Sequence, residues 1–466
     1  MTVPHDWAIY GPFSSLNDKQ EVAISQDGQK EAMEHAGRTG GLPFVGVGWY
    51  RTEFDVPQFQ AGKRATILFD GAMSHANVYI NGQKVGYWPY GYNSFHFDIT
   101  KYLKPGEKNT LAVRLENLPE SSRWYPGAGL YRNVHLIITE DAYIPVWGTY
   151  ITTPSVNEKF AKVNVRTKVV LPEGADPAKY SVETSVWNPN KQKLTAVRTS
   201  LAQMKYNNNQ AEQEFVIQAP SLWSPEMPAL YSAETRLYEG DKLKDIYTTP
   251  FGIRSIEIIP DKGFFLNGKR TVFKGVCNHH DLGPLGAAVN DAAIRRQIRI
   301  LKDMGCNAIR TSHNMPAPEL IRACDEMGMM IMAESFDEWN VAKCKNGYNL
   351  LFDEWAEKDL VNLLHNFRNN PSVVMWCIGN EVPNQWNEGD CKIAKWLQDI
   401  CHREDPTRPV TQGMDAPDAV VNNNFAAVMD VAGFNYRPFK YKINYKKLPQ
   451  RIVLGSETAS TVSSRG

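Results

Sequence analysis

The second half of the chain alternates between short apolar strands and amphipathic helices, and this alternation limits the possible folds more than any other feature. The strand-like segment 271–278 is followed by residues 291–305, in which Ile294, Ile298 and Leu301 recur at helical spacing. The same unit recurs three more times, and three further apolar segments supply strands with weaker helical patterns between them. Seven strands that alternate with helices predict a parallel sheet.

Residues 256–466 are therefore predicted to form an incomplete (β/α)8 TIM barrel with strands one to seven present and the eighth absent. The near-regular recurrence suits a barrel better than an open, doubly wound sheet. A doubly wound nucleotide fold would need a glycine-rich loop after the first strand, where this chain has His279, His280 and Asp281. In a barrel, polar residues at the carboxyl ends of the strands converge on one site.

Nearly every predicted strand ends in polar residues. In chain order they are His279 and His280; Arg310, His313 and Asn314; Glu334 and Asp337; Asn380 and Glu381; Asn435 and Tyr436; and Glu457. One such group alone more often caps a helix or lies in a solvated loop. Together they indicate one site, because Glu381 and Glu457 are two carboxylates at strand tips, without a thiol nucleophile or metal-ligand spacing.

Two carboxylates of this kind are what glycoside hydrolysis requires. One acid protonates the leaving oxygen, and the other carboxylate attacks or stabilises the oxocarbenium-like centre. Trp376, Cys377 and Ile378 give Glu381 an apolar setting that favours its protonated form. The other carboxylate, Glu457, is expected to face Arg310 or Tyr436, either of which would hold it ionised.

The first 255 residues read as β-structure in two units. Alternation over 65–80, followed by the hairpin dipeptide Asn81-Gly82, predicts a meander of strands. We expect a jelly-roll-like β-sandwich at 1–143 and an immunoglobulin-like β-sandwich at 144–255, each built from short alternating strands separated by polar turns.

The charge balance limits the partners. The 466 residues carry 51 basic and 51 acidic side chains, so the formal net charge is zero and neither nucleic acid nor an anionic membrane is expected as a partner. No apolar run approaches the roughly 18 residues of a membrane span, and the first residues show no secretory signal. The partner is expected to be neutral or small, and a homo-oligomer stays open.

The chain has seven cysteines, an odd number, and no two of them form a C-x-x-C pair. We expect buried, reduced thiols rather than a disulfide framework or a zinc site.

Several long motifs make the sequence recognisable. The barrel segments KGVCNHHDLGPLGAAV, NAIRTSHNMPAPELIRACDEMGMMIMAESFDEW, PSVVMWCIGNE and VLGSETAS, with LPFVGVGWYRTEF and SRWYPGAGLYRNV nearer the N-terminus, resemble glycoside hydrolase family 2. Within that family they look like the β-galactosidases of Bacteroides-type bacteria. The resemblance runs the whole length of the chain, and it implies that the first sandwich is of the sugar-binding type and that the substrate is a carbohydrate.

The resemblance also implies a retaining mechanism, with Glu381 as acid/base and Glu457 as nucleophile. Asn380 would bind the sugar 2-hydroxyl while Glu381 reaches the glycosidic oxygen. The residues expected to bind substrate are His279, Arg310, His313, Asn314, Asp337, Asn380 and Tyr436.

The chain departs from the family pattern at three places. It has Asn370 in RNNPS where the family usually has His, and we expect a local structural effect only. Some family members bind magnesium through a Glu and a His after the third strand, but AESFDEWNVA contains no His, so we expect no catalytic magnesium and no cofactor. Only nine residues follow Glu457. We therefore expect a piece of a longer protein, whose parent would be periplasmic or secreted, and activity of this chain alone stays open.

Two alternatives remain open at this point. Related family members cleave β-glucuronides or β-mannosides, and the Asn-x-Lys signature expected of a glucuronidase would lie near the eighth strand. A non-catalytic carbohydrate-binding fragment is the rival from another class. Four tryptophans could stack on sugar rings, although core packing is the commoner role of such side chains: Trp88, Trp124, Trp339 and Trp386.

Overall fold

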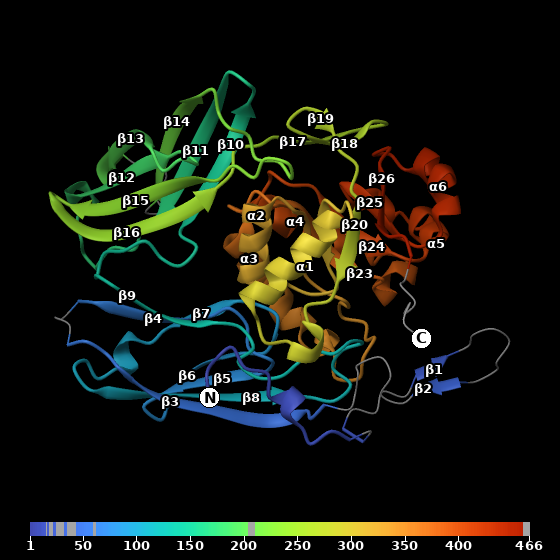
Figure 1. Cartoon of the computed structure of the whole chain (residues 1–466), viewed down its shortest axis with the longest axis horizontal. Helices are drawn as coiled ribbons and strands as arrows, with labels where there is room; N and C mark the ends of the chain where they lie inside the picture. Colours follow the sequence, from blue (N-terminus) through green and yellow to red (C-terminus); the bar gives the residue numbers. More distant parts are fainter. Residues whose placement is uncertain are drawn as a thin grey trace.

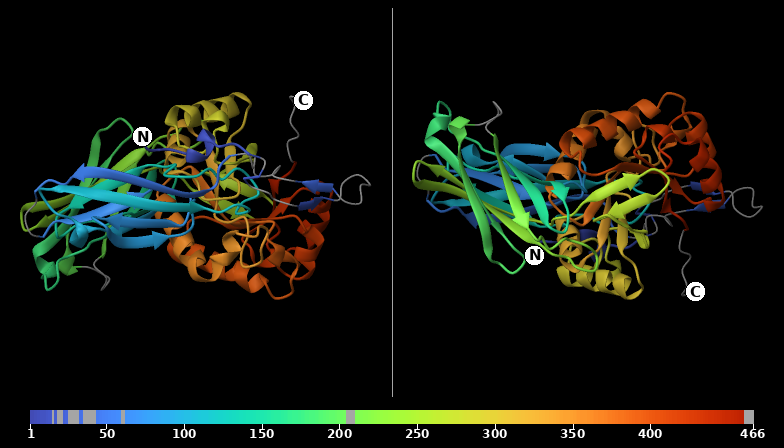
Figure 2. Two further views of the ribbon diagram at one scale, coloured as in Figure 1. Left: turned by 90° about the horizontal axis from the view of Figure 1, so that it is seen from below. Right: turned by 90° about the horizontal axis from the view of Figure 1, so that it is seen from above.

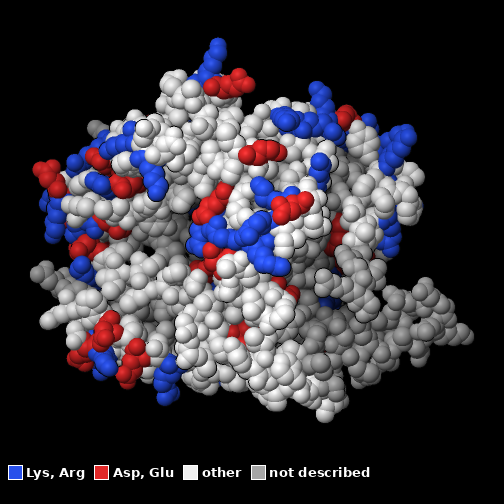
Figure 3. Space-filling model, in the orientation of Figure 1, with Lys and Arg blue, Asp and Glu red and all other residues white. Residues whose placement is uncertain are grey.

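The computed structural model places two β-sandwiches beside a parallel sheet flanked by helices (Figure 1). It describes residues 1–14, 16–17, 22–24, 32–34, 43–58, 62–203 and 210–459. Figure 2 shows both sandwiches on one side of the molecule and the helices around the parallel sheet on the other. Basic and acidic side chains are interspersed over the face drawn in Figure 3, in keeping with the zero net charge.

The first sandwich packs a four-stranded sheet, in the order β3-β8-β5-β6, against a three-stranded sheet, in the order β7-β4-β9. Its strands are β3 (Gly46–Asp55), β4 (Arg64–Phe69), β5 (Ala76–Ile80), β6 (Gln83–Trp88), β7 (Phe95–Asp98), β8 (Lys108–Asn117) and β9 (Val134–Thr139). A separate short pair, β1 (Val22–Ile24) and β2 (Ala32–Glu34), precedes them.

The predicted meander over 65–80 is wrong, because β4 and β5 belong to opposite sheets. The alternation identified the buried face of each strand correctly, and Ile67 and Val78 lie in the same core. Alternation with period two specifies which side chains point inward but not which strand is the neighbour. The hairpin at Asn81-Gly82 is confirmed: both residues have positive φ, as a two-residue hairpin turn requires, and they join β5 to β6.

The second sandwich packs β10-β11-β14 against β13-β12-β15-β16. Its strands are β10 (Thr149–Val156), β11 (Phe160–Lys168), β12 (Tyr180–Trp187), β13 (Lys193–Ser200), β14 (Gln210–Gln218), β15 (Tyr231–Glu239) and β16 (Lys242–Phe251). Val163 and Val165 of β11 pack with Phe215 and Ala233 between the two sheets. The arrangement is the immunoglobulin-like one that the alternation predicts.

A small antiparallel sheet leads into the parallel one. It consists of β17 (Ile256–Ile259), β18 (Gly263–Leu266) and β19 (Lys269–Arg270). The parallel strands are β20 (Gly275–Asn278), β21 (Ala308–Thr311), β22 (Met330–Glu334), β23 (Val373–Asn380), β24 (Val410–Met414), β25 (Val431–Asn435) and β26 (Val453–Glu457). They are paired in strict chain order, so the described sheet lacks the reversal of a doubly wound fold and matches the predicted partial barrel of seven strands.

The helices bury the apolar stripes that the sequence predicts. They are α1 (Asp291–Asp303), α2 (Pro318–Met327), α3 (Phe352–Phe367), α4 (Cys391–Glu404), α5 (Pro417–Asn422) and α6 (Tyr441–Lys447). Ile294, Ile298 and Leu301 of α1 are buried, because their spacing places them on one face of the helix. Within the described ranges, no helix has the length and apolar character needed to cross a membrane.

All seven cysteines are free thiols, but the expectation that all are buried is wrong. Four are buried, whereas Cys306 and Cys391 are half-buried and Cys277 is exposed. Cys277 lies on β20, an edge strand of the parallel sheet as described, so its backbone has a neighbouring strand on one side only. Its Sγ nevertheless donates to the carbonyl of Ser456 on β26 at 3.4 Å, which brings the two edges of the curved sheet together.

Asn370, the departure from the family pattern, has the local role expected of it. Its amide donates to Asp325 at 2.5 Å, and the same carboxylate accepts the backbone N–H of Ser372 at 2.9 Å. These bonds fix the turn that precedes β23.

Asp6 joins the N-terminal segment to both the first sandwich and the barrel. Its buried carboxylate accepts the backbone N–H groups of Ala8 at 3.0 Å, Ala128 at 2.9 Å and Ala287 at 2.8 Å, and the Tyr125 hydroxyl at 2.5 Å. Only 1% of the residue is exposed, so water cannot replace these bonds. The carboxylate therefore serves as a single acceptor for donors from three segments.

Replacing Asp6 by Ala should lower the free energy of unfolding by about 3 kcal/mol, because several buried donors lose their acceptor at once. The measurement is thermal or urea unfolding of the variant and of the unchanged protein. Asp55→Ala, at an exposed position of β3, is the matched control and should change the stability by less than about 0.5 kcal/mol. Equal, small effects of both changes would contradict the role assigned to Asp6.

Candidate active site

The two strand-tip glutamates converge on one side chain, the amide of Asn435 at the end of β25. Asn435 Nδ2 lies 2.9 Å from Glu381 Oε1 and 3.5 Å from Glu457 Oε2. Glu381 follows β23 and Glu457 ends β26, so strands on both sides of β25 supply the acids. Parallel strands present their carboxyl ends at the same edge of the sheet, which is why residues 76 positions apart in the chain meet here.

Glu457 is surrounded by donors. Arg310 Nη1 donates to its Oε2 at 3.1 Å, and the Tyr436 hydroxyl donates to its Oε1. His313 Nε2 lies 3.8 Å from Oε2. A cation and a hydroxyl thus contact this carboxylate directly.

Arg310 organises the floor of the site. The residue is only 4% exposed, and its guanidinium donates to Glu334 through Nε and to Asn380 Oδ1 at 2.9 Å through Nη2. Burial raises the pKa of Glu334, and the contact with Arg310 opposes that shift. The rigid fork of the guanidinium thus fixes Glu334, Asn380 and Glu457 relative to one another.

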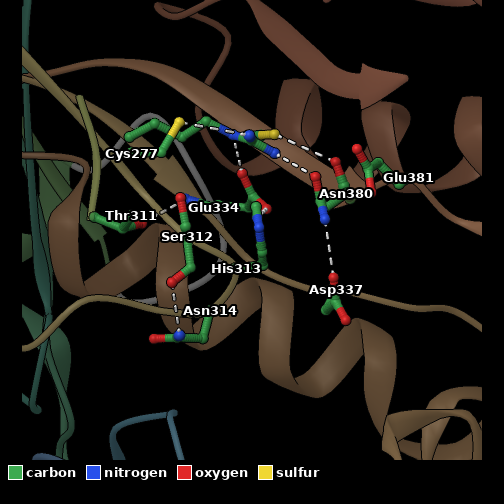
Figure 4. A network of polar contacts seen from close by, with 12 residues as sticks. Cys277, Thr311, Ser312, His313, Asn314, Glu334, Asp337, Asn380 and Glu381 are labelled. Atoms are coloured by element: carbon green, nitrogen blue, oxygen red, sulfur yellow. Dashed lines mark hydrogen bonds and ion pairs between the residues drawn. The ribbon is translucent and has the colours of Figure 1, made fainter. Parts of the chain in front are cut away.

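His313 is held as a neutral ring. Its Nδ1 lies 2.8 Å from Glu334 Oε1 (Figure 4), and burial, reinforced by Arg310, holds the pKa of His313 well below its usual range. The neutral ring has one donor and one acceptor nitrogen, and its Nε2 faces Glu457. Either role at this point suits a sugar hydroxyl.

Glu381 has the opposite environment to Glu457. Burial raises its pKa, Asp415 and Glu457 act in the same direction, and Asn435 and Lys343 oppose them. Its backbone has φ +41°, a left-handed conformation that residues with a Cβ seldom adopt. Such strain costs about 1–3 kcal/mol and persists where the surroundings enforce it, commonly at active sites.

Asp337 is held by a residue of the first sandwich. Arg123 donates to both of its oxygens, through Nε at 2.8 Å and Nη2 at 2.6 Å. Lys343 Nζ donates to Asp337 Oδ1 at 2.9 Å, and Asn380 Nδ2 donates to the same oxygen at 3.0 Å. Burial would raise the pKa of Asp337, but Lys343 and Arg123 outweigh it and hold that pKa well below the usual range.

Sequence reasoning missed part of this network. Glu334 and Asn435 stand among the polar strand ends but were not predicted to be site residues. The contact between Arg123 and Asp337 joins residues 214 positions apart, in different domains. Only the motif SRWYPGAG could have pointed to Arg123, and Lys343 carries no signal in the sequence.

His279 and Asn314 lie at the margin of the site. The His279 ring is exposed, with its centroid 5.0 Å from that of Trp124 and 5.5 Å from that of His313. Asn314 donates to the carbonyl of Ser312 in its own loop at 3.1 Å and does not reach the carboxylates (Figure 4). Its predicted role in binding substrate therefore has no support from a contact with the other site residues.

Of the four candidate tryptophans, Trp124 alone lies beside the predicted site residues. Trp339 is fully buried and donates to the Ile378 carbonyl at 2.9 Å, and Trp88 donates to Asp359 at 2.9 Å. Trp386 is 64% exposed, on the turn after β23.

A cavity of about 510 Å³ opens beside these groups. It is lined by Cys277, His279, Arg310, His313 and Glu457, and an apolar wall from the strand interiors completes it. Most of its lining comes from the inner faces of β20, β21, β22, β23 and β26, and Glu381 is not part of it.

Glu338, an acid in the segment AESFDEWNVA, binds backbone N–H groups. Its carboxylate accepts the N–H groups of Lys343, Cys344 at 3.2 Å and Asn349 at 3.1 Å. Across the residues that the structure describes, no three His, Cys, Asp or Glu side chains are grouped as a metal site requires.

Comparison with known families identifies one family over most of the chain. Three models of one family match consecutive parts of the chain: its sugar binding domain at residues 42–140, its central domain at 143–254 and its TIM barrel domain at 257–462. The chain belongs to glycoside hydrolase family 2. The matched segments follow the two sandwiches and the parallel sheet in order.

Individual family members are similar over nearly the whole chain. A β-galactosidase of Bacteroides ovatus, BoGH2A, is 39% identical, and the match covers 100% of this chain and 56% of that protein. A protein of Formosa agariphila described as a putative β-glucuronidase is 35% identical, over 93% of this chain and 38% of its own length. The crystal structure of a family 2 member from Bacteroides cellulosilyticus superposes with a TM-score of 0.89 at 35% identity, covering 98% of this chain and 57% of that one. The chain thus spans between 38% and 57% of the length of these relatives.

Proposed function

We propose that the protein hydrolyses terminal β-D-galactosides with retention of configuration, using Glu381 as acid/base and Glu457 as nucleophile. One observation carries the proposal: both carboxylates lie against Asn435, yet among the described residues Glu457 accepts from a cation and a hydroxyl whereas Glu381 does not. Burial raises the pKa of Glu381, whereas Arg310 and Tyr436 donate to Glu457. Two carboxyl groups whose environments differ in this way are suited to the separate roles of acid and nucleophile.

In the first step Glu457 attacks the anomeric carbon and forms a glycosyl ester. The bond from that carbon to the glycosidic oxygen breaks, and the proton of Glu381 passes to the leaving oxygen. Arg310 and Tyr436 hold the nucleophile in place until the sugar arrives. Asn380, fixed by Arg310 and Asp337, presents its amide beside the reacting centre.

In the second step water attacks the anomeric carbon and the ester bond to Glu457 breaks. Glu381, now ionised, takes the proton from the water and returns to its starting state. Two inversions at the same carbon give a product with the original configuration.

The separation of the carboxylates supports retention over inversion. Asn435 Nδ2 is 2.9 Å from an oxygen of Glu381 and 3.5 Å from an oxygen of Glu457, so a single amide contacts both side chains. Inverting enzymes hold their carboxyl groups further apart, at roughly 6.5–9.5 Å, to admit a water. We expect the carboxyl groups to be about 5–5.5 Å apart, as in retaining enzymes.

The choice of galactoside rests on the similarity to BoGH2A, and the similarity to a putative β-glucuronidase makes uronides the second candidate. The test is hydrolysis of aryl β-galactoside, β-glucuronide and β-mannoside by the protein at its full natural length, with the first anomer followed by proton NMR. Preferred cleavage of the galactoside with the β-anomer appearing first is expected. Preferred cleavage of another sugar would show that the galactoside is not the substrate. If the α-anomer appeared first, the retaining mechanism would be wrong. Binding without cleavage would favour a non-catalytic carbohydrate-binding protein.

A further inference from the structure

Lys343 approaches the acid/base from the loop after β22, in a position that the catalytic roles above leave unexplained. Its Nζ donates to the carbonyl of Asn380 at 2.6 Å, and this carbonyl belongs to the peptide that joins Asn380 to Glu381. The same ammonium donates to Asp337 at 2.9 Å. Its side chain is only 11% exposed, so the charge is directed into the site rather than into solvent.

The peptide that Lys343 contacts needs support. Glu381 adopts its left-handed backbone at φ +41°, and the structure anchors this residue on three sides. Its N–H donates to the Gly413 carbonyl at 2.7 Å, its carboxylate accepts from Asn435, and the carbonyl before it accepts from Lys343. A strained conformation of this kind persists only when its surroundings fix it.

We propose that Lys343 is a positioning residue for the acid/base: it pins the peptide before Glu381 and places a positive charge beside the Glu381 carboxyl group. The inference rests on the proposed function, since it assigns Lys343 a part in the same reaction.

The charged groups around Glu381 determine the sign of the effect. Asp415, which follows β24, and Glu457, at the end of β26, disfavour the ionised form of Glu381. Lys343 and the more distant Arg123 of the first sandwich favour the ionised form. Asp337 partly neutralises both cations. Removing the charge of Lys343 leaves Asp337 less compensated as well, so both consequences favour the protonated form of Glu381.

The pH profile therefore distinguishes this role from a merely structural one. Glycosylation of an alkyl leaving group needs protonated Glu381, so kcat/KM falls as the pH rises through the pKa of that group. In Lys343→Met this basic limb should move upward by about one pH unit. Lys343→Gln removes the charge but keeps a donor, and it should move the limb in the same direction; Lys343→Arg keeps the charge and should restore the original limb.

Lys345→Met is the matched control, because Lys345 carries the same charge on the same loop but is exposed. Its pH profile should equal that of the unchanged protein. A loss of activity in Lys343→Met and Lys343→Gln that is equal at every pH, with the limb unmoved, would overturn the proposal.

A second readout needs no turnover. Infrared difference spectra between each protein and its Glu381→Gln counterpart follow the protonation of the Glu381 carboxyl group directly. The titration midpoint should be higher in Lys343→Met than with Lys343 present, and an unchanged midpoint would refute the proposal. If no glycoside were hydrolysed, the proposed function would fail while this titration still tested the effect of Lys343.

Discussion

Replacing Glu457 by Gln should abolish turnover of every glycoside, with kcat falling by on the order of 10⁵-fold or more. Glutamine keeps the shape of the side chain, and its amide oxygen can still accept from Arg310, but the amide does not form a glycosyl ester. The loss should be the same for good and poor leaving groups, because the glycosyl ester cannot form whichever group leaves. Steady-state rates on aryl and alkyl glycosides measure it.

Glu388→Gln is the control for this change, because Glu388 is an exposed glutamate in the loop after β23, and its kcat should not change. Azide gives a second, qualitative check. In Glu457→Ala the anion can enter the vacated space and displace the leaving group directly, so an α-glycosyl azide is expected. Residual turnover by Glu457→Gln near the original rate would exclude this residue as the nucleophile.

Replacing Glu381 by Gln should make the rate of glycosylation depend steeply on the leaving group. Activated aryl glycosides need no proton, so their first step should proceed at nearly the original rate, whereas alkyl glycosides should react about 10²–10⁴-fold more slowly. Water then lacks a base for the second step, so the glycosyl ester should accumulate. Pre-steady-state release of the aryl group, a burst followed by slow turnover, measures both effects.

Azide should rescue the Glu381→Gln variant with a β-glycosyl azide as product, because a small anion attacks the ester without a base. If the anomers of the two azide products were exchanged between the Glu381 and Glu457 variants, the two roles would have to be exchanged as well. A loss of rate independent of the leaving group would exclude Glu381 as the acid.

The central elements of the site could be predicted from the sequence because they depend on local pattern. A buried strand such as β23 is recognisable from its apolar run, and the residue after it lies at a strand end in any parallel sheet. This reasoning brought Arg310, Asn380, Glu381, Tyr436 and Glu457 to one place, and the structure also places them together.

The rest of the site depends on contacts between distant parts of the chain. Arg123 reaches Asp337 only because the first sandwich packs against the barrel, and no local pattern encodes that packing. For the same reason the alternation in β4 and β5 identified their buried faces but not their partner strands. The left-handed backbone of Glu381 and the position of Asn435 between the two acids likewise could not be predicted from the sequence, because neither residue type demands them.

Covalent trapping tests the central claim most directly. An activated 2-deoxy-2-fluoro glycoside of the preferred sugar slows both steps, but its good leaving group lets the ester form, so a retaining enzyme accumulates the glycosyl adduct. Mass spectrometry of the intact protein should show one sugar per chain, and peptide mapping should locate it on Glu457. Hydrolysis of the ordinary glycoside without any adduct from the fluorinated one, or an adduct on a residue other than Glu457, would contradict the account.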